Sequence, residues 1–300
     1  MTYNNYENQL DLAMSNSKAR RAMRKHFGKK SISYDEFIDG AIGSISDVEM
    51  INLLAREKQW VDTGSPIIFI ENRGLAHQLY SASFDAKDFN VEPPFKTFAL
   101  SFPKGTVIEG ITMQTTLVTI MTVAECIEIN RDILNVSSSS DEIENSDELC
   151  ICLSSNDRTY AACGHSYLSI YEDPMLKSQN GEAVTEQDIL TKMALSLCVY
   201  HSATEGKKLK AGFPKTWAKK SKMKNKANGR SMVLRGMGCG SKPSNTTTHQ
   251  ERKITLKVPF FRNLRAARYY QGKHKNKPIG SRWVFVQGID LNGSQHSLLS

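Results

Sequence analysis

The most apolar segment of this chain, "ILTKMALSLCVY" at positions 189–200, does most to limit how the chain can fold. It follows Thr185-Glu-Gln-Asp188, in which a hydroxyl and a carboxylate can bond the backbone N–H groups left open at a helix start. The segment is shorter than the roughly 18 apolar residues of a membrane helix, and it contains Lys192. We therefore predict a core helix over 186–201, with these side chains pointing inward: Ile189, Leu190, Met193, Leu197 and Tyr200.

The middle of the chain has the pattern of β-strands. Phe98, Leu100 and Phe102 occupy alternate positions, as in a strand with one buried face. Neighbouring runs are rich in β-branched residues, whereas the serine-rich, acidic stretch at 137–148 is typical of an exposed loop. Asn156-Asp157 predicts a turn between two paired strands. The predicted strands are 66–70, 98–102, 106–111, 116–123, 149–153, 159–171, 254–261 and 282–286.

The first 60 residues have helical spacing instead. Ser46-Asp-Val-Glu49 matches a capping box, and the segment after it places Val48, Ile51, Leu54 and Ala55 on one stripe. N-terminal helices, a mostly antiparallel central sheet, a packing helix and a basic C-terminal strand cassette together predict an α+β fold.

We divide the 300 residues into three parts. Residues 1–65 form a helical N-terminal segment, 66–204 an α+β core, and 205–300 a basic C-terminal region with edge strands. The N-terminus lacks the apolar run of a secretion signal, and no segment reaches membrane length. We therefore expect a cytoplasmic protein, in whatever cell makes it, whose six cysteines are thiols.

The net charge of +8 conceals a strongly uneven distribution. Residues 206–282 contain 22 Lys and Arg residues and one acidic residue, Glu251, whereas the rest of the chain is net acidic. Such a basic half is typical of a surface that binds nucleic acid. A solubilising arm with ordinary edge-strand decoration is the alternative interpretation.

The cassette "FFRNLRAARYYQGKHKNKPIGSRWVFVQG", from Phe260 to Gly288, interleaves basic and aromatic residues. Because it lies between two predicted strands, we expect a held basic loop that presents Tyr269, Tyr270 and His274 outward. Cations would neutralise phosphates, and aromatic rings would stack on unpaired bases. The predicted contacts with nucleic acid are Arg262, Arg265, Arg268, Tyr269, Tyr270, Lys273, His274, Lys275, Lys219 and Lys220.

A candidate metal site comes from Cys150-x-Cys152 and Cys163-x-His165. Residues two apart on a strand face the same side, so two paired strands could present three thiolates and an imidazole to one zinc ion. The alternative is that the cysteines are small core residues. We expect no cofactor, with zinc at these four residues as the alternative.

Enzymatic activity has weaker support in the sequence. Cys163 or Cys198 could act as a nucleophile with a nearby histidine, His165 or His201, but no motif supplies an oxyanion hole. Glu125, Glu128 and Asp132 could form a nuclease-like metal site, although a solvated face explains them better. We therefore expect a non-enzymatic protein.

Three segments taken together resemble the C-terminal half of a family of phage and mobile-element proteins. They are "ILTKMALSLCVYHSATEGK", "RSMVLRGMGCGS" and the cassette, and the resemblance covers residues from about 149 to about 290. The best-known member of the family is a type V-A anti-CRISPR, which recognises the nascent N-terminal peptide of the nuclease and causes loss of its messenger RNA. Related proteins carry His-Trp or His-Phe after Arg-Gly, where this chain has Ala267-Arg268-Tyr269-Tyr270 and a histidine displaced to His274.

The resemblance implies a phage- or plasmid-encoded, anti-CRISPR-like regulator that evades host defence. Its implied partners are the ribosome or RNA and the nascent peptide of a host or CRISPR protein, with no membrane. Two other functions stay open: a general RNA- or DNA-binding protein of phage host takeover, and a metal-dependent nuclease. The resemblance does not name the target peptide.

Overall fold

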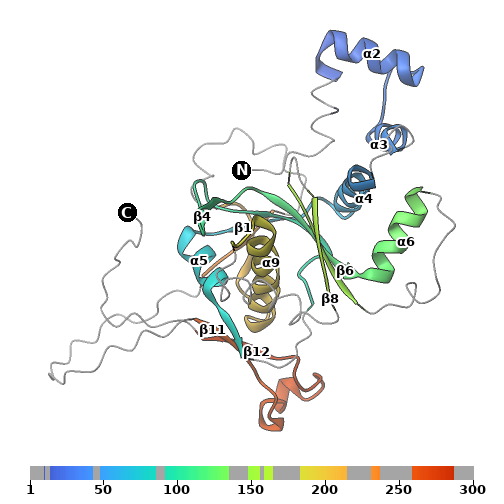
Figure 1. Ribbon diagram of the computed structural model, residues 1–300. Helices are drawn as coiled ribbons and strands as arrows, with labels where there is room; N and C mark the ends of the chain where they lie inside the picture. The colour runs from blue at the N-terminus through green and yellow to red at the C-terminus, as the bar shows by residue number, and fades with distance from the viewer. Residues whose placement is uncertain are drawn as a thin grey trace.

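Two β-sheets, with one helix between them, form the centre of the molecule (Figure 1). The computed structural model describes residues 10, 14–42, 48–85, 92–134, 148–155, 159–164, 183–214, 231–236 and 259–286. Helices and a mixed sheet occur together in one chain, which confirms the predicted α+β class.

The larger sheet has seven strands in the order β8-β7-β6-β3-β1-β10-β9. β1 pairs in parallel with β3 and β10, and every other pair in this sheet is antiparallel, as predicted for most of it. The strands are β1 (Ile67–Ile70), β3 (Thr97–Ser101), β6 (Thr116–Thr122), β7 (Leu149–Ser154), β8 (Thr159–Gly164), β9 (Leu209–Ala211) and β10 (Ser231–Leu234).

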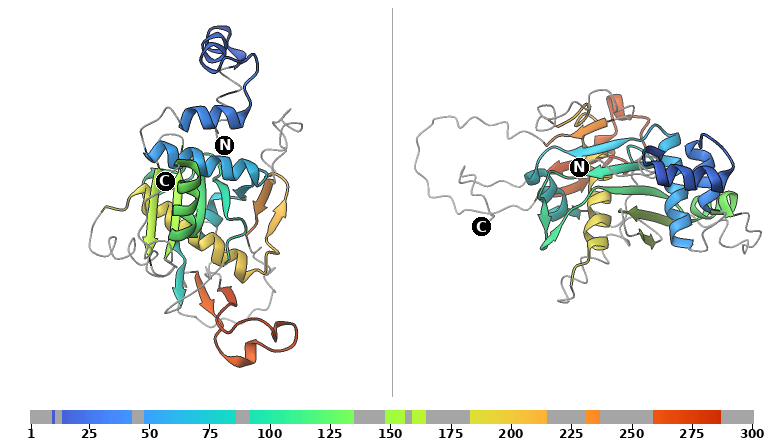
Figure 2. Two further views of the ribbon diagram at one scale, coloured as in Figure 1. Left: turned by 90° about the vertical axis from the view of Figure 1, so that its right-hand side faces the viewer. Right: turned by 90° about the horizontal axis from the view of Figure 1, so that it is seen from above.

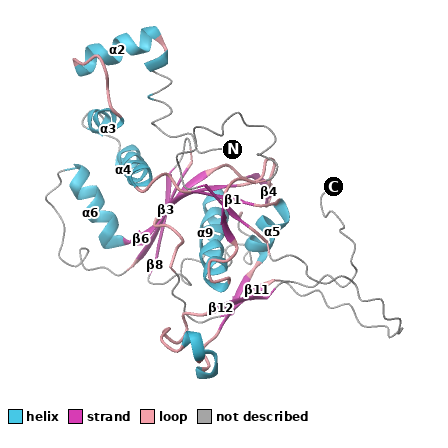
Figure 3. Cartoon of the chain, turned by 180° about the vertical axis from the view of Figure 1, so that it is seen from behind, coloured by secondary structure: helices cyan, strands magenta, loops and turns pink. Residues whose placement is uncertain are grey.

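Helices cover both faces of this sheet (Figures 2 and 3). α4 (Val48–Asp62) and α6 (Val123–Leu134) lie on one face, and α5 (Arg73–Ser81) and α9 (Glu186–Ala203) lie on the other. α4 is fixed by Trp60, which is buried and donates a hydrogen bond from Nε1 to the Pro66 carbonyl at 2.9 Å. Leu54 and Ala55, from the predicted apolar stripe, are also buried.

α9 begins at the predicted capping box. Thr185 Oγ1 accepts a hydrogen bond from Asp188 N at 3.2 Å, and Thr185 N donates to Asp188 Oδ2 at 2.9 Å. All five side chains predicted to point inward are fully buried. Burial extends round nearly the whole helix, because α9 packs on the seven-stranded sheet on one side and on a second sheet on the other. A helix that is apolar all round needs such a position.

The second sheet has three strands in the order β12-β11-β2. Phe285 joins it to the helix, since its ring lies 5.2 Å from that of Tyr200 and 4.9 Å from that of Phe261 between centroids. β11 pairs in parallel with β2 and antiparallel with β12. The strands are β2 (Ser83–Asp85), β11 (Phe260–Asn263) and β12 (Trp283–Val286).

Lys192 is the charged residue within the apolar part of α9. Its ammonium lies 4.6 Å from the centre of the Tyr80 ring on α5, a favourable cation–π contact. Burial lowers the pKa of Lys192 to about 8 and raises the pKa of Tyr80 to about 12, with Glu109 adding to the second shift. The stacked pair explains how this face of α9 accommodates a lysine.

Several elements differ from the sequence-based predictions. Phe260 and Phe261 do not belong to an edge strand, because β11 has partners on both sides. The run at 116–123 ends as a strand at Thr122, and α6 follows at once. α5, α6, β2, β9 and β10 were not predicted, and 107–112 forms a separate hairpin of β4 (Val107–Ile108) and β5 (Ile111–Thr112).

Other predictions fall outside the described residues: Ser46, the loop at 137–147, the turn at 156–157 and the segments 165–171 and 254–258. The predicted domain boundary at 204/205 separates β9 and β10 from strands with which they share a sheet. In the described part of the chain, no helix combines the length and apolar character of a membrane span.

The packing of α9 on the second sheet predicts a large difference in stability between two substitutions in that sheet. Phe261→Ala removes a fully buried ring and should lower the free energy of unfolding by about 3 kcal/mol. Val284→Ala, on the neighbouring strand at a residue 39% exposed, should change it by less than about 0.5 kcal/mol. Urea unfolding measures both, and equal losses would contradict the packing described for α9.

Candidate nucleic-acid interface and cysteine cluster

The cassette spans Phe260–Val286 in the structure and lies at one end of the molecule (Figure 1). β11 and β12 pair antiparallel and hold the connecting segment between them, as predicted. That segment forms two short 3₁₀ turns, η2 (Ala267–Tyr269) and η3 (Gly272–His274). It is therefore an ordered loop with both ends fixed on one sheet.

Tyr270 organises this loop from inside. Its hydroxyl donates to the Leu264 carbonyl at 2.6 Å and accepts from Gly280 N at 2.6 Å and Arg282 N at 3.2 Å. Tyr270 is 8% exposed, so the prediction that it faces outward is wrong. Three backbone groups from distant parts of the loop meet at this one hydroxyl, which is why the loop keeps its shape.

His274 is also buried, contrary to the prediction. Its Nε2 lies 3.5 Å from Glu205 Oε1, at the turn that follows α9, and Lys273 Nζ lies 3.4 Å from Glu205 Oε2. Burial, aided by the charge of Arg282, lowers the pKa of His274. His274 is therefore neutral at pH 7 and adds no positive charge to the cassette.

The turn that presents Glu205 depends on glycine. Gly206 has a φ of +70°, and a Cβ there would lie 3.2 Å from Cε1 of His201. Lys207 holds the Glu205 carboxylate at 2.9 Å, and this hydrogen bond, with the charges of Lys207 and Lys273, lowers the pKa of Glu205 to about 2. The ionised carboxylate attaches the end of α9 to the cassette.

The outer surface of the cassette is cationic. Arg268 donates to the Tyr269 hydroxyl at 3.1 Å, with its guanidinium carbon 5.0 Å from the ring centre. No Asp or Glu occurs between residues 259 and 286. The exposed cations are Arg262, Arg265, Arg268, Lys273, Lys275 and Lys277. Five of these six were predicted contacts, whereas Lys219 and Lys220 lie outside the described residues.

A cavity of about 1030 Å³ opens between the cassette and the end of α9. Arg265 and Lys277 supply cations to its wall, and Ile279, at 66% exposed, supplies an apolar side chain. The sequence did not point to this cavity, because its walls come from segments far apart in the chain. They are Glu92, Pro93, Pro94, His201, Ser202, Glu205, Gly206, Arg265, Lys277, Pro278, Ile279, Gly280 and Ser281.

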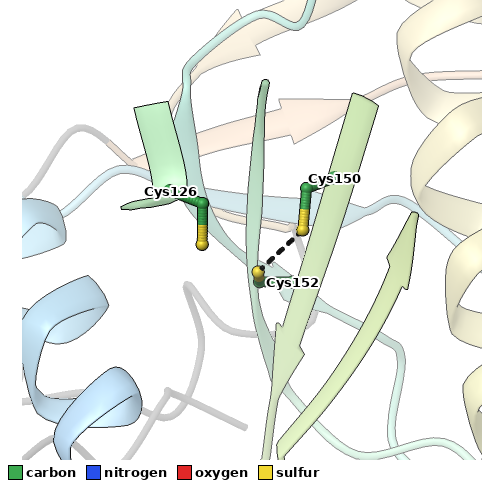
Figure 4. A group of neighbouring side chains, drawn as sticks. All are labelled: Cys126, Cys150 and Cys152. Atoms are coloured by element: carbon green, nitrogen blue, oxygen red, sulfur yellow. Dashed lines mark hydrogen bonds between the residues drawn. The ribbon is translucent and has the colours of Figure 1, made fainter. Parts of the chain in front are cut away.

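Only the Cys150 and Cys152 part of the predicted metal site is seen as expected, and the third cysteine of the group is a different one. Cys150 and Cys152 lie side by side on β7 with their sulfurs 3.5 Å apart, and Cys126 of α6 completes a group of three (Figure 4). All three sulfurs lie within 4.8 Å of one another. Position 163 is the register partner of Cys150 on β8, and His165 lies outside the described residues.

Cys126 was missed because the sequence analysis did not recognise α6. Thr122 Oγ1 accepts from Glu125 N at 3.1 Å, and Thr122 N donates to Glu125 Oε2 at 2.9 Å, a capping box that starts the helix. The pattern Thr122-x-x-Glu125 could have revealed the helix, and with it Cys126. Glu125, a candidate for a nuclease site, is instead a helix cap paired with Lys96 at 2.6 Å.

The thiols differ strongly in acidity. Cys150 and Cys152 form hydrogen bonds to the Cys126 sulfur, and these bonds, with the charge of Arg56, lower the pKa of Cys126 to about 3. Burial raises the pKa of Cys198 far above that of an ordinary thiol, which removes it as a nucleophile. Cys126, Cys150, Cys152 and Cys198 are thiols rather than disulfides, as predicted for them.

Comparison of the chain with protein-family models, with curated protein sequences and with solved structures found no match. The resemblance to the anti-CRISPR family therefore stays a prediction.

The role of Tyr270 predicts a local effect of removing one oxygen. Tyr270→Phe leaves three backbone groups without their shared partner, so amide hydrogen exchange at Gly280 and Arg282 should quicken about tenfold. Tyr269→Phe is the matched control, because its hydroxyl bonds only the exposed Arg268 among these contacts. Unchanged exchange in Tyr270→Phe would contradict an organising role for this hydroxyl.

The lowered pKa of Cys126 predicts an unusual pH dependence of alkylation. Its thiolate is present well below the ordinary thiol pKa, so its reaction with iodoacetamide should change little between about pH 6 and pH 8. In chelator-treated, urea-unfolded protein the same rate should rise about tenfold per pH unit. Mass spectrometry of the Cys126 peptide provides the rates. The same steep rise in folded, chelator-treated protein would contradict the lowered pKa.

Proposed function

We propose that the protein binds single-stranded RNA through the outer surface of the cassette. The observation that carries this proposal is the set of six exposed cations on one cassette that contains no acidic residue, five of them on its ordered loop and Arg262 on β11. Each cation other than Lys273, which pairs with Glu205, can neutralise a phosphate and release a condensed counterion, which favours binding without any reading of sequence. The interior of the loop is built from Tyr270 and His274, so the charges are displayed on a fixed scaffold.

Groups beside the cations favour unpaired bases over a duplex. Tyr269 is half-buried against Arg268, an arrangement that offers a ring and a guanidinium plane for stacking. Ile279 and Pro278 line the neighbouring cavity together with Arg265 and Lys277. A strand whose phosphates follow the cations could place a base against this apolar wall, which a paired base could not reach.

RNA binding is common to two of the functions that the sequence left open. An anti-CRISPR-like regulator at the ribosome and a general nucleic-acid-binding protein of host takeover both need such a surface. They differ in one requirement, because only the first depends on a translating target. Retention on purified RNA with no ribosome present would favour the general binder, and retention on translating ribosomes alone would favour the regulator.

A charge reversal tests the proposal. Arg265→Glu combined with Arg268→Glu removes two phosphate contacts, so affinity for a fluorescent single-stranded RNA should fall at least about 25-fold near 0.1 M salt. The slope of log affinity against log salt should decrease by about 1.4, at about 0.7 for each lost contact. Fluorescence anisotropy across a salt series measures both quantities, and circular dichroism verifies the fold.

The matched control is Lys18→Glu combined with Arg21→Glu. These residues are exposed on the basic helix α2 (Ser17–Phe27), which stands away from the cassette (Figure 1). The control changes the net charge of the protein by the same amount and should retain most of the affinity. Equal losses in the two variants would show that overall charge, rather than the cassette, drives binding, and near-wild-type affinity of the cassette variant would refute the proposal.

A further inference from the structure

Three sulfur atoms converge on one point between α6 and β7. The Cys150 and Cys152 sulfurs are 3.5 Å apart, and all three sulfurs fall within 4.8 Å of one another (Figure 4). Four thiolates around zinc at a Zn–S distance of about 2.3 Å have sulfurs about 3.8 Å apart. The cluster therefore already has nearly the spacing that a bound ion would impose.

From this geometry we propose that Cys126, Cys150 and Cys152 bind a zinc ion that joins α6 to the central sheet. Three thiolates select soft or borderline ions over magnesium or calcium, which prefer oxygen. The site differs from the one predicted from sequence, because Cys126 comes from a helix rather than from the neighbouring strand. Binding would release the protons that the cluster still carries, since a thiolate is the ligand.

The position of Cys126 is fixed by contacts independent of sulfur. The capping box of Thr122 and Glu125 starts α6, and Val123 N donates to the Glu148 carbonyl at 2.7 Å, one residue before β7. Lys96, the residue before β3, pairs with Glu125, with its Nζ 2.6 Å from Oε1. These bonds hold the first turn of α6 at the start of β7, so the ligands are oriented before an ion arrives.

A buried cation lies beside the cluster. Arg56 of α4 is 5% exposed, and its charge acts on both Cys126 and Cys152. Nη2 donates weakly to Ser154 Oγ at 3.5 Å, and Nε has no hydrogen-bond partner among the described residues. Zinc with three thiolates carries a net charge of −1, which a buried guanidinium would balance.

A cluster of small core thiols is the competing account. Met121 and Val123 do pack against these cysteines. That account explains the apolar burial of a cysteine, as for Cys198 inside α9. It does not explain why the buried guanidinium of Arg56 lies beside three sulfurs. The zinc site explains the convergence of the sulfurs and the cation together.

Register indicates where a fourth ligand could come from. Position 163 on β8 is the Cα partner of Cys150, and the residue there is a cysteine. A fourth ligand, either a thiolate or a water molecule, would complete the four-coordinate shell that zinc prefers. A thiolate as the fourth ligand predicts four sulfur neighbours around the zinc, and a water molecule predicts three.

The first test measures metal in the full-length protein. Protein purified without chelator, or reconstituted with zinc, should contain about one zinc per chain by elemental analysis. Co²⁺ in its place should give the intense thiolate charge-transfer absorption. Cys126→Ser should lower zinc affinity at least about tenfold, and Cys198→Ser, a buried cysteine away from the cluster, should not change it. Metal-free protein after reconstitution, or full affinity in Cys126→Ser, would overturn the proposal.

A second measurement does not depend on any variant folding. X-ray absorption at the zinc edge of the wild-type protein should show three or four sulfur neighbours at about 2.3 Å. Four sulfurs that become three in Cys163→Ser would assign the fourth ligand to that residue. A shell of nitrogen and oxygen atoms with fewer than three sulfurs would place the zinc elsewhere and refute the site.

Discussion

The burial of α9 between two sheets is the constraint on which the rest of the structure depends. One side of the helix packs on the seven-stranded sheet, and on the other side Tyr200 contacts Phe285 of the second sheet, which in turn contacts Phe261. The turn that follows α9 carries Glu205, which pairs with Lys273 of the cassette. The same helix thus completes the hydrophobic core and sets the position of the basic surface.

The cassette separates structural roles from surface roles within one short segment. Tyr270 and His274 turn inward and hold the loop, and the Arg and Lys side chains between and around them remain in solvent. Clustered cations repel one another, and a flexible chain would spread them apart. The Tyr270 hydroxyl and the paired strands β11 and β12 resist this, so a concentrated positive field is maintained for an anionic partner.

Sequence reasoning succeeded where a pattern was local. The Thr185 capping box and the apolar period predicted α9 to within about two residues, alternation predicted β3, and the run at 282–286 predicted β12. It failed where a role depends on contacts distant in sequence. Tyr270 and His274 lie in a polar, basic stretch of sequence that is typical of a surface. Their burial follows only from contacts with the second sheet and with Glu205. Pairing with β1 likewise makes a strand of the short segment Ser231–Leu234, and nothing local marks it.

The central claim is that RNA lies on the cassette, and mapping of the contact tests it most directly. The full-length protein would be cross-linked by ultraviolet light to a single-stranded RNA, digested and analysed by mass spectrometry. The account predicts that cross-linked peptides concentrate between Arg262 and Lys277 and around Ile279. Cross-links confined to α2 or to other surfaces, with none in the cassette, would contradict it.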